Sequence, residues 1–177
     1  MRGNKKESGL TLTEILVTIA IIIILSGLII TNSGAGKSQL ALSRSANKLA
    51  QDIRRAQEMA MSAEKCPTGT GCAGQIPPGY GIYLIQDSEN YLLYADTSLP
   101  GEIYNVGDAG IETIPLEKGI KIKNLGSAST SINFKPPDPK INISGGGNEV
   151  FIVIALKADQ TKTRTIMVNK AGLISVE

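Results

Sequence analysis

Residues 10–30 read LTLTEILVTIAIIIILSGLII, and this apolar stretch decides how the rest of the chain is interpreted. As an α-helix, 21 residues span roughly 31 Å, about the thickness of the hydrocarbon core of a bilayer. The preceding nine residues, MRGNKKESG, contain Arg2, Lys5 and Lys6, which favours a cytoplasmic location for this end. The sequence therefore predicts a basic leader over residues 1–9 and a transmembrane helix over residues 10–31, with the remaining chain outside the cytoplasm.

Two simpler interpretations compete with this one. A secretory signal peptide has an apolar region of about 7–15 residues before a small-residue cleavage site. Here the apolar run is longer, and the small residues that resemble such a site follow it at positions 33–36. A plain membrane anchor is the second alternative, but a carboxylate such as Glu14 costs roughly 3 kcal/mol in hydrocarbon and gives a tether no advantage. Because Glu14 has no cationic neighbour in its own helix, we expect its partner to come from another molecule.

The N-terminal sequence resembles the type IV pilin and type II secretion pseudopilin superfamily. The matching features are the basic leader, Gly9 directly before the apolar run, and Glu14 as the fifth residue after Gly9. The resemblance implies that the prepilin peptidase cleaves between Gly9 and Leu10 and methylates the new terminal amine. Leu10 departs from the family, in which Phe is usual at this position. The resemblance further implies that the Leu10 ammonium of one subunit pairs with Glu14 of the next, which is favoured over two unpaired charges in a dry helix bundle.

The same resemblance implies the location and the partners of the protein. It predicts a single-pass protein of the inner membrane, with its head outside the cytoplasm, that is then incorporated into a surface or periplasmic filament. The expected partners are the prepilin peptidase, other pilin or pseudopilin subunits, an inner-membrane assembly platform and the lipid bilayer. No cofactor is expected.

Beyond the apolar run, the sequence predicts a helix that packs on a sheet. Residues 31–36, TNSGAG, are poor helix formers that could loosen or break the helix. Within residues 32–65, apolar side chains then recur at alternating steps of four and three, which places them on one helical face. They are Leu42, Ala46, Leu49, Ile53, Ala56 and Ala60. We expect this short, half-alanine stripe to pack on the chain's own sheet, with a free-standing coiled coil as the alternative.

After Cys72 the pattern changes to period two with β-branched residues, which indicates strands. Eight are predicted, at residues 80–86, 90–95, 111–116, 119–123, 131–134, 149–157, 164–169 and 173–176. The predicted fold class is α+β, with a long N-terminal helix packed through its C-terminal half on an antiparallel sheet, and residues 66–177 as the globular head. Within the head, Gly79-Tyr80-Gly81-Ile82-Tyr83 and residues 165–174 resemble the H-type minor pseudopilins and related minor pilins.

The two cysteines, Cys66 and Cys72, are close in sequence and allow two interpretations. A metal clip is one, but two thiolates in a chain with no His make a poor zinc site. If this region lies outside the cell, a disulfide that closes a small loop is favoured.

The composition argues against an enzyme, because a chain without His lacks the commonest general base and cannot form a Ser/His/Asp or Cys/His set. The chain also contains no phosphate-binding loop of the Walker type. Acidic residues between positions 87 and 117 could bind calcium, but their spacing matches no compact loop of oxygen ligands. We therefore expect no metal site. Asn142-Ile143-Ser144 fits the N-glycosylation pattern, a short motif with many false matches.

Charge is distributed unevenly along the chain. Removal of the leader, with its three basic and one acidic residue, leaves 15 basic and 15 acidic residues of the original 18 and 16. Seven acidic residues follow one another without an intervening Lys or Arg: Asp87, Glu89, Asp96, Glu102, Asp108, Glu112 and Glu117. Basic residues predominate from Lys118 onward. This polarity indicates either solvated strand faces or charge complementarity between neighbouring subunits.

A minor pilin that binds extracellular DNA is the alternative function. Its candidate contacts are Arg44, Lys48, Arg54, Arg55, Lys157, Lys162, Arg164 and Lys170. Nucleic acid is not the favoured partner, because these residues are interleaved with acids and aromatic residues are few.

Overall fold

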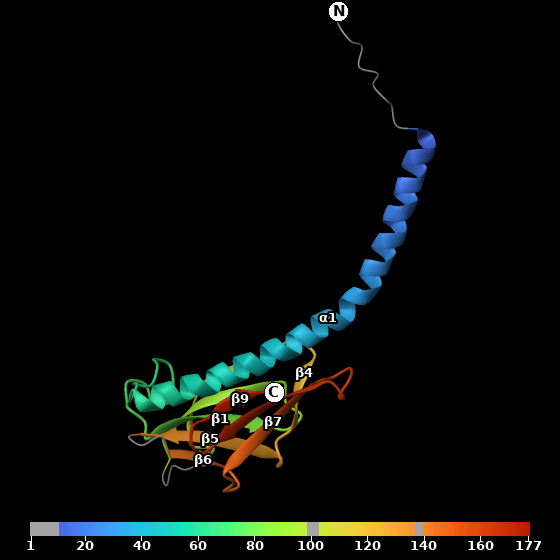
Figure 1. Ribbon diagram of the computed structural model, residues 1–177. Coiled ribbons are helices and arrows are strands. Elements are labelled where there is room, and N and C mark those ends of the chain that lie inside the picture. Colours follow the sequence, from blue (N-terminus) through green and yellow to red (C-terminus); the bar gives the residue numbers. More distant parts are fainter. Residues whose placement is uncertain (1–10, 99–102, 137–139) are drawn as a thin grey trace, which may run out of the picture. The chain divides into compact units, whose positions relative to one another are not determined.

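A computed structural model describes residues 11–98, 103–136 and 140–177, without the side chains of residues 28–35 and 140. The chain divides into two compact units, Met1–Lys37 and Ser38–Glu177, which are treated separately below. The described residues form one helix, α1 (Leu12–Met61), and nine strands (Figure 1). The strands are β1 (Gly79–Ile85), β2 (Asn90–Asp96), β3 (Ala109–Pro115), β4 (Ile120–Asn124), β5 (Ser129–Lys135), β6 (Lys140–Ile143), β7 (Glu149–Leu156), β8 (Thr163–Asn169) and β9 (Ile174–Val176).

The helical assignment of α1 continues through residues 31–36, so these poor helix formers do not break the helix. A glycine in a helix interior costs only about 1 kcal/mol relative to alanine, and long helical segments on both sides can offset that cost. Helix α1 ends at Met61.

The end of α1 is fixed by backbone geometry that the apolar periodicity does not reveal. Ala63 adopts a left-handed conformation with φ of 48°. The Glu64 N–H donates to the Met59 carbonyl at 3.0 Å and the Ala63 N–H to the Ala60 carbonyl at 3.1 Å. These two bonds make a Schellman motif, in which the left-handed position is usually occupied by glycine.

The nine strands form two antiparallel sheets. The five-stranded sheet has the order β3-β2-β1-β5-β6, and the four-stranded sheet has the order β4-β7-β8-β9. The eight predicted strands correspond to eight of the nine, and β6 has no predicted counterpart. Strand β6 has only four residues, too few for a periodic pattern, and it pairs with β5 alone in its sheet.

Both sheets share one core with the C-terminal half of α1, which runs along them in Figure 1. All six residues of the predicted stripe are at most 3% exposed, so the prediction that this half of the helix packs on its own sheet is confirmed. Strand residues from both sheets complete the core, among them Ile82, Leu93, Ile152 and Ile166. The predicted α+β class, a long N-terminal helix packed on antiparallel sheets, is likewise confirmed.

Polar contacts reinforce the junction between helix and sheets. The Tyr91 hydroxyl donates to the Asp52 carboxylate at 2.5 Å, which joins β2 to α1. Burial and this partner raise the pKa of Tyr91, so the phenol keeps its proton. From the other sheet, the Ile174 carbonyl accepts a 3.0 Å bond from the Arg54 guanidinium. The same helix is therefore attached to both sheets.

Candidate functional site

The first four turns of the described helix present apolar side chains on every side. All residues from Thr11 to Gly27 are exposed. The large apolar ones are each 47–79% exposed: Leu12, Ile15, Leu16, Val17, Ile19, Ile21, Ile22, Ile23, Ile24 and Leu25. A soluble monomer rarely leaves such a continuous apolar surface uncovered, so this surface indicates contact with lipid or with other protein chains. We call residues 12–27 the apolar segment.

Glu14 lies in the first turn of α1, three residues after the N-cap residue Thr11. Thr11 flanks the helix, and its hydroxyl accepts a 3.3 Å bond from the Glu14 N–H. The Thr11 carbonyl accepts bonds from the N–H groups of Glu14 and Ile15 at 3.1 and 3.3 Å. Thr11-Leu12-Thr13-Glu14 therefore has the sequence and half of the hydrogen bonding of a capping box. The Thr-x-x-Glu pattern is the local sequence signal for this cap.

The position of Glu14 suits a negative charge, because the amino end of a helix carries a partial positive charge. No ion pair within the described chain involves Glu14. Gly9 and Leu10, the predicted processing residues, lie outside the described residues. The pairing of Leu10 with Glu14 between subunits therefore stays a prediction.

None of the described helical residues forms a stretch that is long and apolar enough to cross a membrane. The predicted transmembrane segment over residues 10–31 stays a prediction, as does the division into residues 1–9, 10–31, 32–65 and 66–177.

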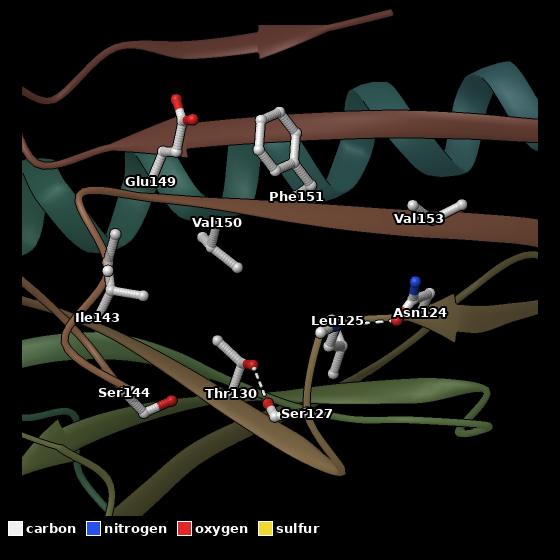
Figure 2. Close-up of a pocket in the computed structure, with 13 residues that line it drawn as sticks. Asn124, Leu125, Ser127, Thr130, Ile143, Ser144, Glu149, Val150, Phe151 and Val153 are labelled. Atoms are coloured by element: carbon white, nitrogen blue, oxygen red, sulfur yellow. Dashed lines mark hydrogen bonds between the residues drawn. The ribbon is translucent and has the colours of Figure 1, made fainter.

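A groove of about 400 Å³ lies between the two sheets of the head (Figure 2). Its apolar lining includes Leu125, Ile143 and Val150, and its hydroxyl groups come from Ser127, Thr130 and Ser144. Figure 2 shows β7 along one side, with the turn after β4 and the strand that bears Thr130 along the other. We call it the inter-sheet groove. Sequence periodicity could not have revealed it, because its walls come from four separate segments of the chain.

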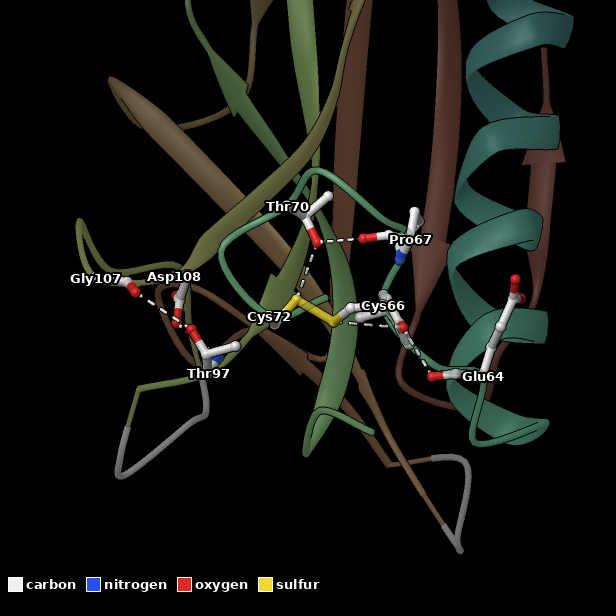
Figure 3. The surroundings of a disulfide bond; sticks show 9 residues. Glu64, Cys66, Pro67, Thr70, Cys72, Thr97, Gly107 and Asp108 are labelled. Carbon is white, nitrogen blue, oxygen red and sulfur yellow. Dashed lines mark hydrogen bonds between the residues drawn. A yellow bond between two sulfur atoms is a disulfide. The ribbon is translucent and has the colours of Figure 1, made fainter. Parts of the chain in front are cut away.

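Cys66 and Cys72 form the predicted disulfide, with an S–S distance of 2.08 Å (Figure 3). The loop that it closes is further held by a 2.8 Å bond from the Cys66 N–H to the Gln75 carbonyl. The Tyr80 hydroxyl donates to the Glu64 carbonyl at 2.8 Å, which connects the end of the helix region to β1. Because both sulfur atoms are oxidised, the alternative of a metal clip at these cysteines is wrong.

Three residues of the acidic run pair with basic residues of the same chain. Lys121 bonds Asp87 at 2.7 Å, Arg55 bonds Glu112 at 2.9 Å, and Lys157 contacts Glu89. These side chains are partly exposed, so each pair adds little to stability. The pairs join segments of opposite charge within one chain. Over the part of the chain that is described, no group of three or more His, Cys, Asp or Glu side chains could hold a metal ion.

Most of the candidate DNA contacts already have protein partners. Arg54 and Arg55 make the bonds described above, Lys157 contacts Glu89, and Lys162 lies 3.8 Å from Asp159. Lys170 donates to the Gly146 carbonyl at 3.4 Å. The structure therefore does not gather these residues into one free basic patch. The possible glycosylation residue Asn142 lies half-buried in β6, opposite Asn133 of β5.

Comparison with known proteins identifies the N-terminal signal. Residues 4–30 match the family model described as the prokaryotic N-terminal methylation motif. No curated protein and no solved structure gives a significant match. The chain therefore carries a prepilin-type signal, which supports a subunit like a type IV pilin or pseudopilin. The motif ends at residue 30, so it does not test the narrower likeness of the head to H-type minor pseudopilins.

Proposed function

We propose that the protein is a structural subunit of a type IV pilus or a type II secretion pseudopilus. The observation that carries the proposal is the coincidence of two features over the same residues. The methylation motif covers residues 4–30, and the structure leaves the apolar segment within it exposed on all sides. A segment of this kind, attached to a head with its own core, can join many subunits through their helices while the heads remain separate folding units.

In this proposal, prepilin peptidase cuts between Gly9 and Leu10 while the apolar segment holds the precursor in the inner membrane. The ammonium of Leu10 in one subunit then pairs with the Glu14 carboxylate of a neighbour. In an apolar bundle of helices, this pair is strongly favoured over two separate charges, so it sets the axial register between subunits. The assembly platform and other pilin or pseudopilin subunits are the partners that such a process requires.

The narrower assignment to the H-type minor pseudopilins rests on the sequence of the head alone. Gly79-Tyr80-Gly81 opens β1, and residues 165–174 include most of β8 and the start of β9. We retain a structural rather than an enzymatic role, because the sequence lacks the residues for acid–base chemistry by His.

DNA binding is the weaker alternative, because no observation on the head favours it. Five of its eight candidate cations have partners within the chain, and DNA would have to displace them. A gel-shift titration of the full chain in detergent at low salt tests this alternative directly. A shift that weakens steeply with added salt would support it.

Mass spectrometry of the mature N-terminus tests the main proposal. The chain is purified from cells with and without the prepilin peptidase, and the first residue is identified in each. We expect a methylated terminus at Leu10 that is lost without the peptidase. Cleavage near residue 36 that is independent of this peptidase would instead indicate an ordinary signal peptide and would overturn the proposal.

A further inference from the structure

Part of β7 has a backbone edge without a neighbouring strand. In an antiparallel ladder, the N–H and C=O groups of one residue point to the same side, and successive residues alternate. The Leu156 N–H donates to Lys162 and the Asn148 carbonyl accepts from Lys170, so even-numbered residues of β7 face β8. The Lys157 N–H donates to the Gly119 carbonyl, so odd-numbered residues face β4. Residues Glu149, Phe151 and Val153 therefore direct their backbone groups away from β8.

Strand β4 covers only the C-terminal half of that edge. Its last pair joins Asn124 to Val153, after which the chain turns away at Leu125. The backbone groups of Phe151 and Glu149 have no hydrogen-bond partner on this side among the described residues. They border the inter-sheet groove, whose lining includes both residues.

The outer edge of β4 shows how this head covers a strand edge elsewhere. There, the turn between β1 and β2 lies along β4, and the Asp87 N–H donates a 2.8 Å hydrogen bond to the Ile122 carbonyl. The Ile122 N–H returns a bond to the Ser88 carbonyl at 2.9 Å. Uncovered edges invite pairing with another chain, and natural proteins usually block them. The edge at Phe151 lacks such a cover within the described chain.

The side chains that line the inter-sheet groove determine which kind of molecule can bind there. Val150 points into the gap, whereas the ring of Phe151 points away from it (Figure 2). The hydroxyls of Ser127 and Thr130 bond each other at 3.0 Å, and the Ser144 hydroxyl accepts from the Ser131 N–H at 2.9 Å. These side chains are thus already engaged. Glu149 is the charged side chain of the lining, and no ion pair in the described chain includes it.

We propose that the inter-sheet groove binds an extended segment of a partner protein, which adds to β7 as a short antiparallel strand. One guest residue exchanges two backbone hydrogen bonds with Phe151, and the residue two positions later lies opposite Glu149. The guest continues the line of β4, so its C-terminal end is the one near the Glu149 carboxylate. The guest residue between these two points its side chain into the groove, and this side chain is apolar because it faces Val150, Leu125 and Ile143. A lysine or arginine follows the two paired residues, near the Glu149 carboxylate. Strand addition of this kind draws affinity from the backbone and specificity from alternate side chains.

The size of the groove agrees with a short guest. A volume of about 400 Å³ lies within the range of roughly 300–1,000 Å³ that is typical of ligand sites. The proposal goes beyond assembly through the helix, because it concerns a surface of the head that the apolar segment does not contribute to.

The test uses the full chain in detergent micelles and a defined probe. The probe is a fluorescein-labelled peptide of alternating valine and threonine with two lysines at its amidated C-terminus, and binding is followed by fluorescence anisotropy. Phe151→Pro removes the free N–H and leaves the bonds of β7 to β8 intact, since proline is tolerated where the N–H is unpaired. Phe151→Ala is the matched control, because it removes the ring and keeps the N–H. We expect the proline variant to bind about tenfold more weakly and the alanine variant to bind like the parent protein, in line with the loss of about one hydrogen bond.

A second measurement leaves the protein unchanged. The probe is N-methylated at one residue at a time, and methylation at alternate positions should weaken binding, because only those N–H groups face β7. Glu149→Gln should also weaken binding, and more strongly at low salt. Absence of binding by the probe, or equal binding by the methylated peptides, would overturn the proposal. The chain could instead associate with itself, and Phe151→Pro could abolish that association. The occupant of the groove would then be a second copy of the chain, and this result would also overturn the proposal.

Discussion

The Asn133 amide donates a 2.7 Å hydrogen bond to the Asp96 carboxylate, across β1 from β5 to β2. The bond is possible because β1 has glycine at this place. A Cβ atom at Gly79 would lie 2.8 Å from the Asn133 side-chain oxygen and 2.6 Å from the Phe134 carbonyl oxygen. At Gly81, a Cβ atom would lie 2.7 Å from the Tyr94 ring. The Gly-x-Gly pattern at the start of β1 thus makes room for side chains from both neighbouring strands.

Substitution of these glycines should destabilise the head. Gly79→Ala and Gly81→Ala each force backbone atoms apart, and overpacking of this kind costs about 1–3 kcal/mol. Gly110→Ala in β3 is the matched control, because its Cβ would meet only the end of the Leu92 side chain, at 3.4 Å. Urea unfolding of the three variants measures the difference. Equal stability of Gly81→Ala and Gly110→Ala would contradict this account.

Asp96 should make the stability of the head depend on pH. Burial raises the pKa of this carboxyl, and its hydrogen bond with Asn133 only partly opposes the effect. A carboxyl with a raised pKa in the folded state binds its proton more tightly there than in the unfolded chain. Its contribution to stability is therefore present below the unfolded pKa of about 3.9 and is lost as the pH rises through the folded value.

Asp96→Asn imitates the protonated form and removes this titration. We expect the variant to gain stability relative to the parent protein as the pH increases from 4 to 7. Because all other groups titrate in both proteins, the difference between their unfolding free energies isolates Asp96. A difference that does not change with pH would show that the carboxyl does not titrate in this range.

Ala63→Gly should stabilise the protein. The left-handed conformation of Ala63 costs an L-residue about 1 kcal/mol, and glycine adopts it without this penalty. Thermal unfolding should show an increased midpoint, whereas Ala50→Gly, at a buried position inside α1, should lower it. An unchanged or decreased midpoint for Ala63→Gly would mean that the Schellman geometry does not persist in solution.

Removal of the disulfide should destabilise the head by a moderate amount. Cys66 and Cys72 are six residues apart, and closure of so short a loop contributes about 2 kcal/mol in the chain-entropy account. The double variant Cys66→Ala/Cys72→Ala should unfold at lower urea concentration than the oxidised parent. Dithiothreitol should shift the parent towards the double variant and leave the double variant unchanged. A parent protein that is insensitive to the reductant after unfolding and refolding would contradict the expectation.

Two variants of Glu14 separate its charge from the capping that a polar side chain at this position can provide. Glutamine can replace glutamate in a capping box, whereas alanine cannot. If the carboxylate pairs with the Leu10 ammonium of a neighbour, Glu14→Gln and Glu14→Ala should both abolish incorporation into filaments. Circular dichroism in micelles should then show the parent's helix content for Glu14→Gln. Recovery of assembly by the glutamine variant would make the cap, rather than the charge, the function of this residue.

Local sequence was sufficient where structure depends on neighbouring residues. The apolar segment follows from a continuous run of apolar residues. The helical stripe from Leu42 to Ala60 and eight strands follow from periodicity, because each of these elements buries one face at a fixed spacing. The disulfide could be anticipated because two cysteines in a chain without His have few other partners. The N-terminal signal is a contiguous motif, so the sequence alone displays it.

Tertiary structure decided the features that depend on residues far apart in the chain. The continuity of α1 through a glycine-containing stretch, the short strand β6 and the left-handed Ala63 give no periodic signal. Asp96 and Asn133 meet across Gly79 only because three strands lie side by side. Three residues of the acidic run likewise reach Lys121, Lys157 and Arg55 from separate segments of the chain. The inter-sheet groove exists because β4 ends opposite Val153 while β7 continues to Glu149. That mismatch in strand length follows from how the strands pair, not from either strand's sequence alone.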